Sequence, residues 1–179
     1  MHILVMGLVL LLGGHTVMAA PLASLVQAAG LRAIDEPQSA ADFQLPNLNG
    51  QQLRLQDQRG KVILLNFWAT WCPPCIHEMP LMDQLYQGLR PQPFVIWAVA
   101  MQEDRDKVAP FMDKHRFQFT TLLDRDGAVS ARYKVRGLPT TYLIDCRGNT
   151  VGWIIGPQEW ASDAVRTLLA ALLSDPSCG

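Results

Sequence analysis

One short segment constrains the fold of this chain more than any other: an apolar run is followed closely by two cysteines. Residues 61–67 read KVILLNF, which is typical of a strand buried on both faces of a sheet. The sequence Trp71-Cys72-Pro73-Pro74-Cys75 comes next, and a helix is expected from about Cys72 towards Arg90, kinked where Pro80 removes an N–H group. Two prolines are tolerated at a helix start because the first N–H groups have no helical partner. The segment therefore predicts a strand, a turn and a helix, with a CxxC pair where the helix begins.

The rest of the chain alternates between strand-like and helix-like segments. A hairpin is expected over residues 43–55, with Asn49-Gly50 at its turn. Strands are predicted at 94–100, 120–123, 140–144 and 151–155, and helices at 104–115, 128–135 and 159–173. The last two strands are expected to pair around Arg147-Gly148-Asn149. This order predicts an α/β fold with a central mixed β-sheet flanked by helices and an N-terminal hairpin extension.

The composition supports one folded domain and gives no sign of a strongly charged partner. Of the 179 residues, 49% are hydrophobic and 17% are charged, which is enough apolar sequence for a packed core. The 15 basic residues nearly balance the 16 acidic ones, and no basic or acidic cluster stands out along the chain. A nucleic-acid partner is therefore not expected.

The N-terminal segment differs from the rest because it is apolar and uncharged. Residues 3–12 are continuously apolar, and no Asp, Glu, Lys or Arg precedes Arg32. Val17-Met18-Ala19 suits a signal peptidase, although the Lys or Arg expected before the apolar run of a signal peptide is missing. The uncharged stretch is also long enough for a membrane anchor if Gly13, Gly14 and His15 are tolerated within it. We expect residues 1–20 to be a signal peptide or membrane anchor, 21–40 a linker or a loosely attached helix, and 41–176 the folded domain. Either form of the leader predicts export, with possible membrane association at the N-terminus.

Thiol–disulfide exchange is the chemistry that the cysteine pair fits best. The reaction needs a thiolate, and the N–H groups and positive dipole at a helix start favour a charged sulfur. Cys72, first at the helix start, is expected to be the exposed nucleophile, and Cys75, turned into the helix, the shielded resolving thiol. A zinc site would need a second ligand pair, yet outside the N-terminal segment only His77 and His115 remain. A purely structural disulfide is disfavoured because it would close a very small loop.

Three stretches together resemble the TlpA/ResA branch of the thioredoxin superfamily: FWATWCPPC, then Glu78-Met79-Pro80, and later GLPTTYLID over residues 137–145. The resemblance covers the chain from about Phe43 to its C-terminal helix. It implies a thioredoxin-like sandwich and a periplasmic or otherwise extracytoplasmic protein thiol-disulfide oxidoreductase, without a cofactor. It also implies a reductant that takes electrons from a membrane thiol-electron transporter and passes them to client proteins with Cys pairs. Known tasks of the branch are cytochrome c maturation and the reduction of copper-site cysteines.

The resemblance also implies a surface that contacts the client. Pro139 is expected to be a cis proline packed beside the dithiol, which would expose the backbone of Leu138 to an extended client segment. Trp71, Pro73 and Pro74 are expected to contact the client as well. Outside the resemblance, Pro139 would be an ordinary turn proline before a strand.

Glu78 has two interpretations. Thioredoxin has a buried Asp as proton acceptor where this chain has Asn66, whereas the TlpA/ResA branch has a Glu three residues after the second cysteine, which matches Glu78. Cys75 and Glu78 would share one helix face, so that a buried Glu78 could take the proton of Cys75. The other interpretation is an acid that is simply favoured near a helix start.

Two further side chains near the dithiol, those of Trp68 and His77, each have two interpretations. Trp68 is expected either to shape the surface around the cysteines, as Trp71 does, or to lie in the core. His77 is expected to be a solvated side chain, with stabilisation of a thiolate as the alternative.

Two further cysteines, Cys146 and Cys178, lie outside the common pattern. An even number of cysteines in an oxidising compartment favours a structural disulfide between them, which would hold the C-terminus against the second hairpin. Two free thiols or a second redox relay are the alternatives.

Three functions compete with the reductase hypothesis. A disulfide-forming oxidase would use the same chemistry in reverse, since direction depends on the reduction potential. A copper-binding chaperone would use Cys72 and Cys75 with a histidine, but the relatives of that kind carry CxxxC rather than CxxC. A peroxidase would need a single reactive cysteine with its own Thr and Arg environment, and no such motif is visible.

Overall fold

The computed structural model describes residues 21–179, so the predicted signal peptide or anchor at residues 1–20 lies outside the described residues. The helices are α1 (Leu22–Ala28), α2 (Pro73–Leu89), α3 (Arg105–His115), α4 (Ala128–Arg132) and α5 (Asp163–Leu173), with a 3₁₀ turn at Leu55–Gln58. The strands are β1 (Arg32–Ser39), β2 (Gln44–Pro46), β3 (Gln52–Arg54), β4 (Val62–Trp68), β5 (Phe94–Met101), β6 (Thr120–Asp124), β7 (Thr140–Ile144) and β8 (Asn149–Ile155). Among these helices, none has the length and apolar character that a membrane span requires.

The main sheet has six strands in the order β1-β8-β7-β4-β5-β6, and it is mixed as predicted. Strands β4, β5 and β6 are parallel, whereas β7 runs antiparallel to β4, and β8 and β1 are antiparallel to their neighbours. The predicted N-terminal hairpin is the small sheet of β2 and β3, with Gly50 at its turn in a left-handed conformation (φ 80°) that glycine adopts freely.

Strand β4 divides its side chains between two cores, because successive residues of a strand point to opposite faces. Ile63, Leu65 and Phe67 belong to one buried cluster, whereas Leu64 and Trp68 belong to the other. Asn66 falls on the same face as Leu64 and Trp68, and it is fully buried. One polar residue in an otherwise apolar strand thus points into the core on the face that α2 covers.

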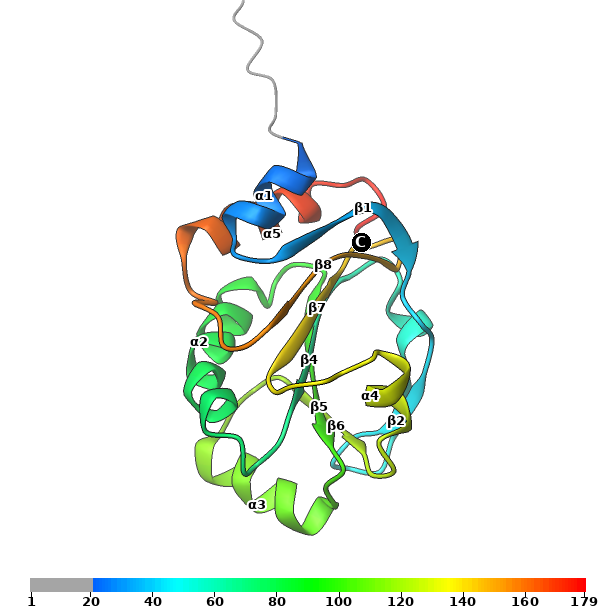
Figure 1. Ribbon diagram of the computed structural model, residues 1–179, viewed down its shortest axis with the longest axis vertical. Helices are drawn as coiled ribbons and strands as arrows, with labels where there is room; N and C mark the ends of the chain where they lie inside the picture. Colours follow the sequence, from blue (N-terminus) through cyan, green and yellow to red (C-terminus); the bar gives the residue numbers. More distant parts are fainter. Residues whose placement is uncertain (1–20) are drawn as a thin grey trace, which may run out of the picture.

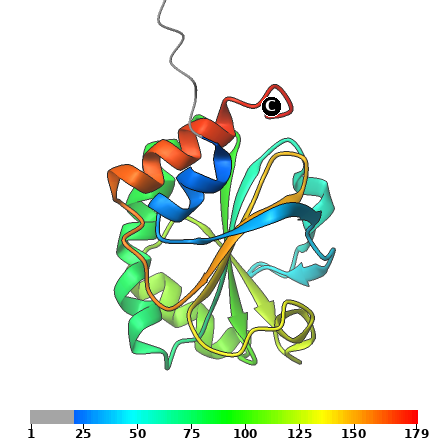
Figure 2. The same cartoon turned by 45° about the horizontal axis from the view of Figure 1, so that its top comes forward.

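The two faces of the sheet are covered unequally. Helices α1, α2, α3 and α5 contribute their buried side chains to one cluster, and α4 with the β2–β3 region contributes to the other. Figure 1 shows this arrangement, and Figure 2, seen more from the top, shows α1 and α5 side by side next to β1 and β8. The result is the predicted sandwich, with its dithiol helix α2 on the face that carries four helices.

Residues 21–40 were expected to be a linker or a loosely attached helix outside the folded domain, whereas they form α1 and β1 and are packed into it. Helix α1 is fixed by Val26, which is fully buried, and β1 pairs with β8 as an edge strand of the main sheet. Val26 fits closely because Gly152 has no side chain: a Cβ there would lie 2.6 Å from Val26 Cγ1. The register of β1 shifts between Ala33 and Gln38, so an interrupted strand with no regular apolar alternation joins the sheet through its backbone.

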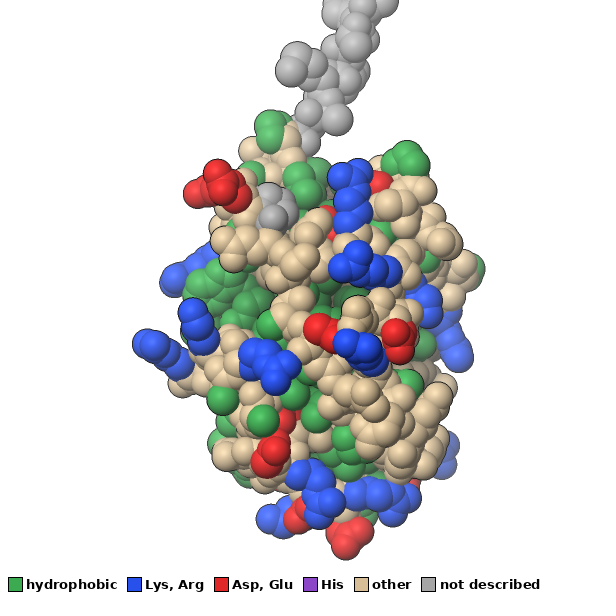
Figure 3. All heavy atoms as spheres, turned by 90° about the vertical axis from the view of Figure 1, so that its right-hand side faces the viewer, with side chains coloured by type: hydrophobic (Ala, Val, Ile, Leu, Met, Phe, Trp, Pro, Cys, Tyr) green, Lys and Arg blue, Asp and Glu red, His purple; other side chains and the backbone are tan. Residues whose placement is uncertain are grey.

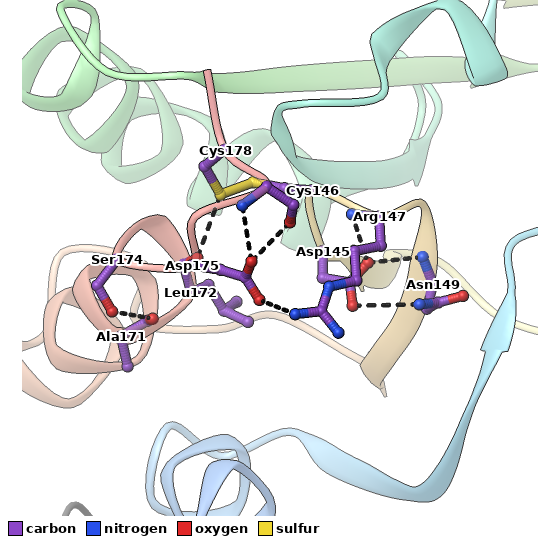
Figure 4. The surroundings of a disulfide bond; sticks show 10 residues. Asp145, Cys146, Arg147, Asn149, Ala171, Leu172, Ser174, Asp175 and Cys178 are labelled. Atoms are coloured by element: carbon purple, nitrogen blue, oxygen red, sulfur yellow. Dashed lines mark hydrogen bonds and ion pairs between the residues drawn. A yellow bond between two sulfur atoms is a disulfide. The ribbon is translucent and has the colours of Figure 1, made fainter.

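The C-terminus is held against the β7–β8 turn, as predicted, by a disulfide between Cys146 and Cys178, whose Cα atoms are 5.2 Å apart. Figure 4 shows the surrounding bonds: Arg147 pairs with Asp175 at 2.8 Å, and Cys178 Sγ lies 3.3 Å from the carbonyl oxygen of Leu172. The N–H of Gly179 also donates to the carbonyl oxygen of Gly60 (2.9 Å), just before β4.

The surface charges are scattered on the face that Figure 3 shows, which is the side of β1 and β2. Lys and Arg side chains form separate groups there, interspersed with neutral and acidic side chains, rather than one continuous basic patch. This face therefore offers no extended surface of one sign for a polyanion.

Candidate redox site

Cys72 and Cys75 lie where β4 passes into α2, and a disulfide joins them with their Cα atoms 5.3 Å apart. Cys72 is the N-cap of α2, and Pro73 and Pro74 occupy its first two positions. Because neither proline has an N–H group, the first free helical N–H belongs to Cys75, and it donates to Cys72 Sγ at 3.3 Å. The sequence thus places an amide donor and the positive end of the helix at the sulfur of Cys72, which favours its thiolate.

Cys72 was expected to be exposed, but in the structure it is buried. In this oxidised form its side chain is only 3% exposed, and Cys75 is fully buried. The burial follows from the disulfide itself, because the bond ties the sulfur of Cys72 to that of a core residue. Cys72 is still the more exposed of the two cysteines, as expected. It lines a surface groove, whereas Cys75 does not.

That groove has a volume of about 400 Å³ and runs beside the disulfide. Its lining is mostly apolar and comprises Trp71, Cys72, Pro73, Pro74, Met101, Val135, Arg136, Gly137 and Leu138. Trp71 stands at its edge and is 66% exposed, the largest such aromatic surface among the described residues. The predicted client-contacting residues Trp71, Pro73, Pro74 and Leu138 are therefore brought together around one opening.

The β4–β7 register explains how the Leu138–Pro139 segment, although distant in the sequence, reaches the groove that Cys72 and Leu138 line. Phe67, at the end of β4, is paired with Thr140, at the start of β7, so the residue before Thr140 reaches the end of the sheet where α2 begins (Figure 1). The Leu138–Pro139 peptide bond is cis, as predicted. Within residues 21–179, neither the N–H nor the C=O of Leu138 makes a hydrogen bond, which leaves this backbone available to an extended segment.

The structure decides between the two interpretations of Trp68 and shows where His77 lies. Trp68 is fully buried and packs against Phe111 in the core, so it does not shape the surface around the cysteines. His77 is exposed on α2, which agrees with a solvated side chain.

Glu78 is the buried acid of the site, with only 1% of its surface exposed. Its Oε1 accepts a hydrogen bond from Asn66 Nδ2 (2.9 Å), and its Oε2 accepts from the N–H of Gln158 (3.1 Å) and from Trp160 Nε1 (2.9 Å). Burial raises the pKa of Glu78 to about 7, although these three hydrogen bonds partly oppose the rise. Cys75 and Glu78 are both on the buried face of α2, so a carboxyl group with a near-neutral pKa shares that face with the second cysteine.

Comparison with known proteins identifies the family. The AhpC/TSA family model matches residues 37–151. This chain is 42% identical over 118 residues to the thiol-disulfide oxidoreductase ResA of Geobacillus kaustophilus, covering 66% of this chain and 68% of that protein. It is 39% identical over 128 residues to ResA of Bacillus subtilis, covering 72% of each. The chain belongs to the AhpC/TSA family.

Solved structures show the same fold for this AhpC/TSA family member. A thiol:disulfide interchange protein of the thioredoxin family from Chlorobium tepidum superposes with a TM-score of 0.69 at 28% identity, covering 79% of this chain and all of that one. The pneumococcal exposed lipoprotein thioredoxin Etrx1 superposes with a TM-score of 0.61 at 30% identity, covering 74% and 100%. With its CxxC disulfide and ResA-like sequence, the chain is a protein thiol-disulfide oxidoreductase with a thioredoxin-like fold.

Several residues of the site were missed in the sequence. Glu103, 4% exposed, accepts from the N–H (2.7 Å) and the hydroxyl (2.5 Å) of Thr70, and so holds the loop that precedes Cys72. Gln158 and Trp160 contact Glu78 from the segment between β8 and α5, beyond the residues that the family model matches. No local pattern marks these residues, because only the folded chain brings them next to α2.

Proposed function

We propose that this AhpC/TSA family member is an extracytoplasmic reductant of client protein disulfides. The observation that carries the proposal is the juxtaposition of three features: a dithiol at a helix N-terminus, an apolar groove with a free strand-like backbone at Leu138, and a buried carboxyl at Glu78. The groove would take an extended client segment alongside Leu138 and Pro139, with Trp71, Pro73 and Pro74 against its side chains.

The reaction proceeds through a mixed disulfide. The Cys72 thiolate attacks a client disulfide, forming a bond between Cys72 Sγ and one client sulfur and releasing the other client sulfur as a thiolate, which takes a proton from water. Glu78 accepts the proton of Cys75, and the Cys75 thiolate then attacks Cys72 Sγ. The Cys72–Cys75 bond forms, the second client sulfur leaves as a thiolate and is protonated, and the client is reduced while this protein is oxidised.

The location and the partners belong to the same proposal. Residues 1–20, apolar and uncharged, would act as a signal peptide or anchor. The Etrx1 relative is described as an exposed lipoprotein, which supports a place outside the cytoplasm for this fold. A membrane thiol-electron transporter would return the dithiol to its reduced form, and the clients would be Cys pairs of cytochrome c precursors or of copper-binding proteins.

Trapping tests this function directly. In a Cys75→Ser variant the resolving thiol is gone, so client proteins should remain bound to Cys72 as mixed disulfides that a reducing agent releases. The control is Cys72→Ser, which should trap nothing because it lacks the attacking sulfur. If the Cys75→Ser variant captures no protein from an extract of the exported fraction, the client-reductase function is wrong.

A further inference from the structure

The two oxygens of the Glu78 carboxyl group are held differently. Oε2 accepts two N–H groups, from Trp160 Nε1 at 2.9 Å and from the backbone of Gln158 at 3.1 Å. Oε1 accepts only one, from Asn66 Nδ2 at 2.9 Å. Since a carboxylate oxygen offers two lone pairs, Oε2 is fully occupied and Oε1 has one free position.

The groups around this carboxyl are fixed by their own contacts. Asn66 Nδ2 also donates to Thr141 Oγ1 (2.9 Å), so both amide hydrogens are engaged and the amide cannot offer Glu78 a second one. The side chain of Gln158 donates to the carbonyl oxygen of Ala29 (2.7 Å), which ties the segment after β8 to the end of α1. Trp160 is 1% exposed within the same core cluster as Cys75.

All hydrogen-bond donors to the carboxyl group are neutral in this oxidised form. They are Asn66 from β4, and Gln158 and Trp160 from the segment before α5, while Cys75 on the same face of α2 is held in the disulfide. Desolvation and these hydrogen bonds are the causes of the shifted pKa of Glu78, with no contribution from another charged side chain. The N–H donors are therefore the groups that set where, and how readily, this carboxyl takes a proton.

We propose that Trp160 is a positioning residue for Glu78: its indole N–H, together with the N–H of Gln158, occupies Oε2 and leaves Oε1 as the oxygen that accepts the proton. Protonation at Oε2 would displace one of two buried N–H donors and leave it unpaired, which is costly in a core. The inference rests on the proposed function of Glu78 as the proton acceptor of Cys75. It extends that function to a residue outside the dithiol helix and outside the matched part of the chain.

The first test compares Trp160→Phe with the unmodified protein by NMR titration of the Glu78 side-chain carboxyl carbon. Phenylalanine keeps an aromatic ring in the core but removes the donor. A donor to a carboxylate favours the charged form, so its loss should raise the pKa of Glu78 by about one to two units. The control is Trp97→Phe, a buried tryptophan on the other face of the sheet that should leave the Glu78 titration unchanged. An unchanged Glu78 titration in Trp160→Phe would overturn the proposal.

The second test needs no variant at position 160 to fold. The protein has five tryptophans, and in a ¹H–¹⁵N spectrum one indole N–H resonance, that of Trp160, should follow the protonation of Glu78 with a midpoint near 7. In Glu78→Gln this pH dependence should vanish. Persistence of the same titration in Glu78→Gln would contradict the proposal.

The two tests are separable from the proposed function. The pH profile of disulfide exchange should lose its midpoint near 7 in Glu78→Gln and should shift upward in Trp160→Phe together with the NMR pKa. A Glu78→Gln profile identical to that of the unmodified protein would refute the proton-acceptor function of Glu78. The indole and carboxyl titrations would still decide whether Trp160 positions the carboxyl group.

Discussion

At the scale of a single residue, the burial of Glu78 changes both its affinity for a proton and the stability of the fold. A carboxyl that is 99% buried with only neutral partners holds its proton more tightly in the folded chain than in the unfolded one, and its pKa rises from 4.5 to about 7. A base with a pKa near neutral can accept and release a proton readily near physiological pH. The same burial makes the charged form unfavourable, so the folded state loses stability where that form is populated.

The pH dependence of stability follows from this shift. Between pH 4.5 and about 7 the folded chain keeps a proton on Glu78 that the unfolded chain has released, so stability falls as the pH rises through that range. The loss should be on the order of 3 kcal/mol and should be absent in Glu78→Gln. Urea unfolding of the oxidised protein at a series of pH values measures it. Glu159→Gln, at an exposed position, is the control and should keep the loss; an equal pH dependence in Glu78→Gln would rule out this account of the buried carboxyl.

At the scale of the elements, α1 and β1 show where sequence patterns fail. The strands β4 and β5 are recognisable because each is a compact, mostly apolar run, and β7 because it is rich in β-branched and aromatic residues; their predicted positions match the structure closely. Strand β1 has no such run, and it joins the sheet by backbone pairing with β8 across an irregular register. Its place depends on a fit between distant residues, Val26 and Gly152, that no local pattern contains.

A double-mutant cycle tests that fit. Gly152→Ala should lower the free energy of unfolding by roughly 1–3 kcal/mol, because the new Cβ would lie 2.6 Å from Val26 Cγ1 and 3.3 Å from the carbonyl oxygen of Arg32. Val26→Ala should relieve the first of these contacts, so the double variant should be more stable than the sum of the single effects predicts. Urea unfolding of the four proteins gives the coupling. Strictly additive effects would contradict the close packing of α1 on β8.

At the scale of the whole molecule, the two disulfides lie in separate parts of the fold. The Cys72–Cys75 pair lines the groove, whereas the Cys146–Cys178 pair lies by the β7–β8 turn and the C-terminus, with Arg147 and Asp175 beside it (Figure 4). The pairing of Cys146 with Cys178 was one of three possibilities in the sequence. Only the fold shows that the two sulfurs pair, since bonding requires the two Cα atoms to come within reach.

Removal of the Cys146–Cys178 disulfide tests whether this bond stabilises the fold or takes part in the redox reaction. Cys146→Ala/Cys178→Ala should lower the free energy of unfolding by roughly 3–4 kcal/mol, because the bond closes a loop with a sequence separation of 32 residues. The rate of disulfide exchange at Cys72 should be unchanged under conditions where the variant is folded. Denaturant unfolding and an exchange assay on the same samples measure both quantities. A loss of exchange activity in the folded variant would indicate a redox relay instead.

The site itself was predictable only where it follows one stretch of sequence. Cys72 and Cys75 could be assigned functions from the CxxC spacing at a helix start, whereas Glu78 was singled out through the family resemblance and kept two interpretations. Pro139 was found through a motif resemblance, and the β4–β7 register explains its position. Trp160 and Glu103 could not be predicted from the sequence, because their hydrogen-bond partners, Glu78 and Thr70, are distant in the sequence and meet them only in the folded chain.

The direction of electron flow is the central claim, and the reduction potential of the Cys72–Cys75 couple tests it most directly. The measurement is equilibration of the protein with glutathione buffers of known ratio, with the oxidised and reduced forms separated by thiol alkylation. A reductant of client disulfides should have a potential below about −200 mV, on the side of the thioredoxins. A potential near or above about −150 mV, towards that of strong disulfide-forming oxidants, would contradict the proposed function.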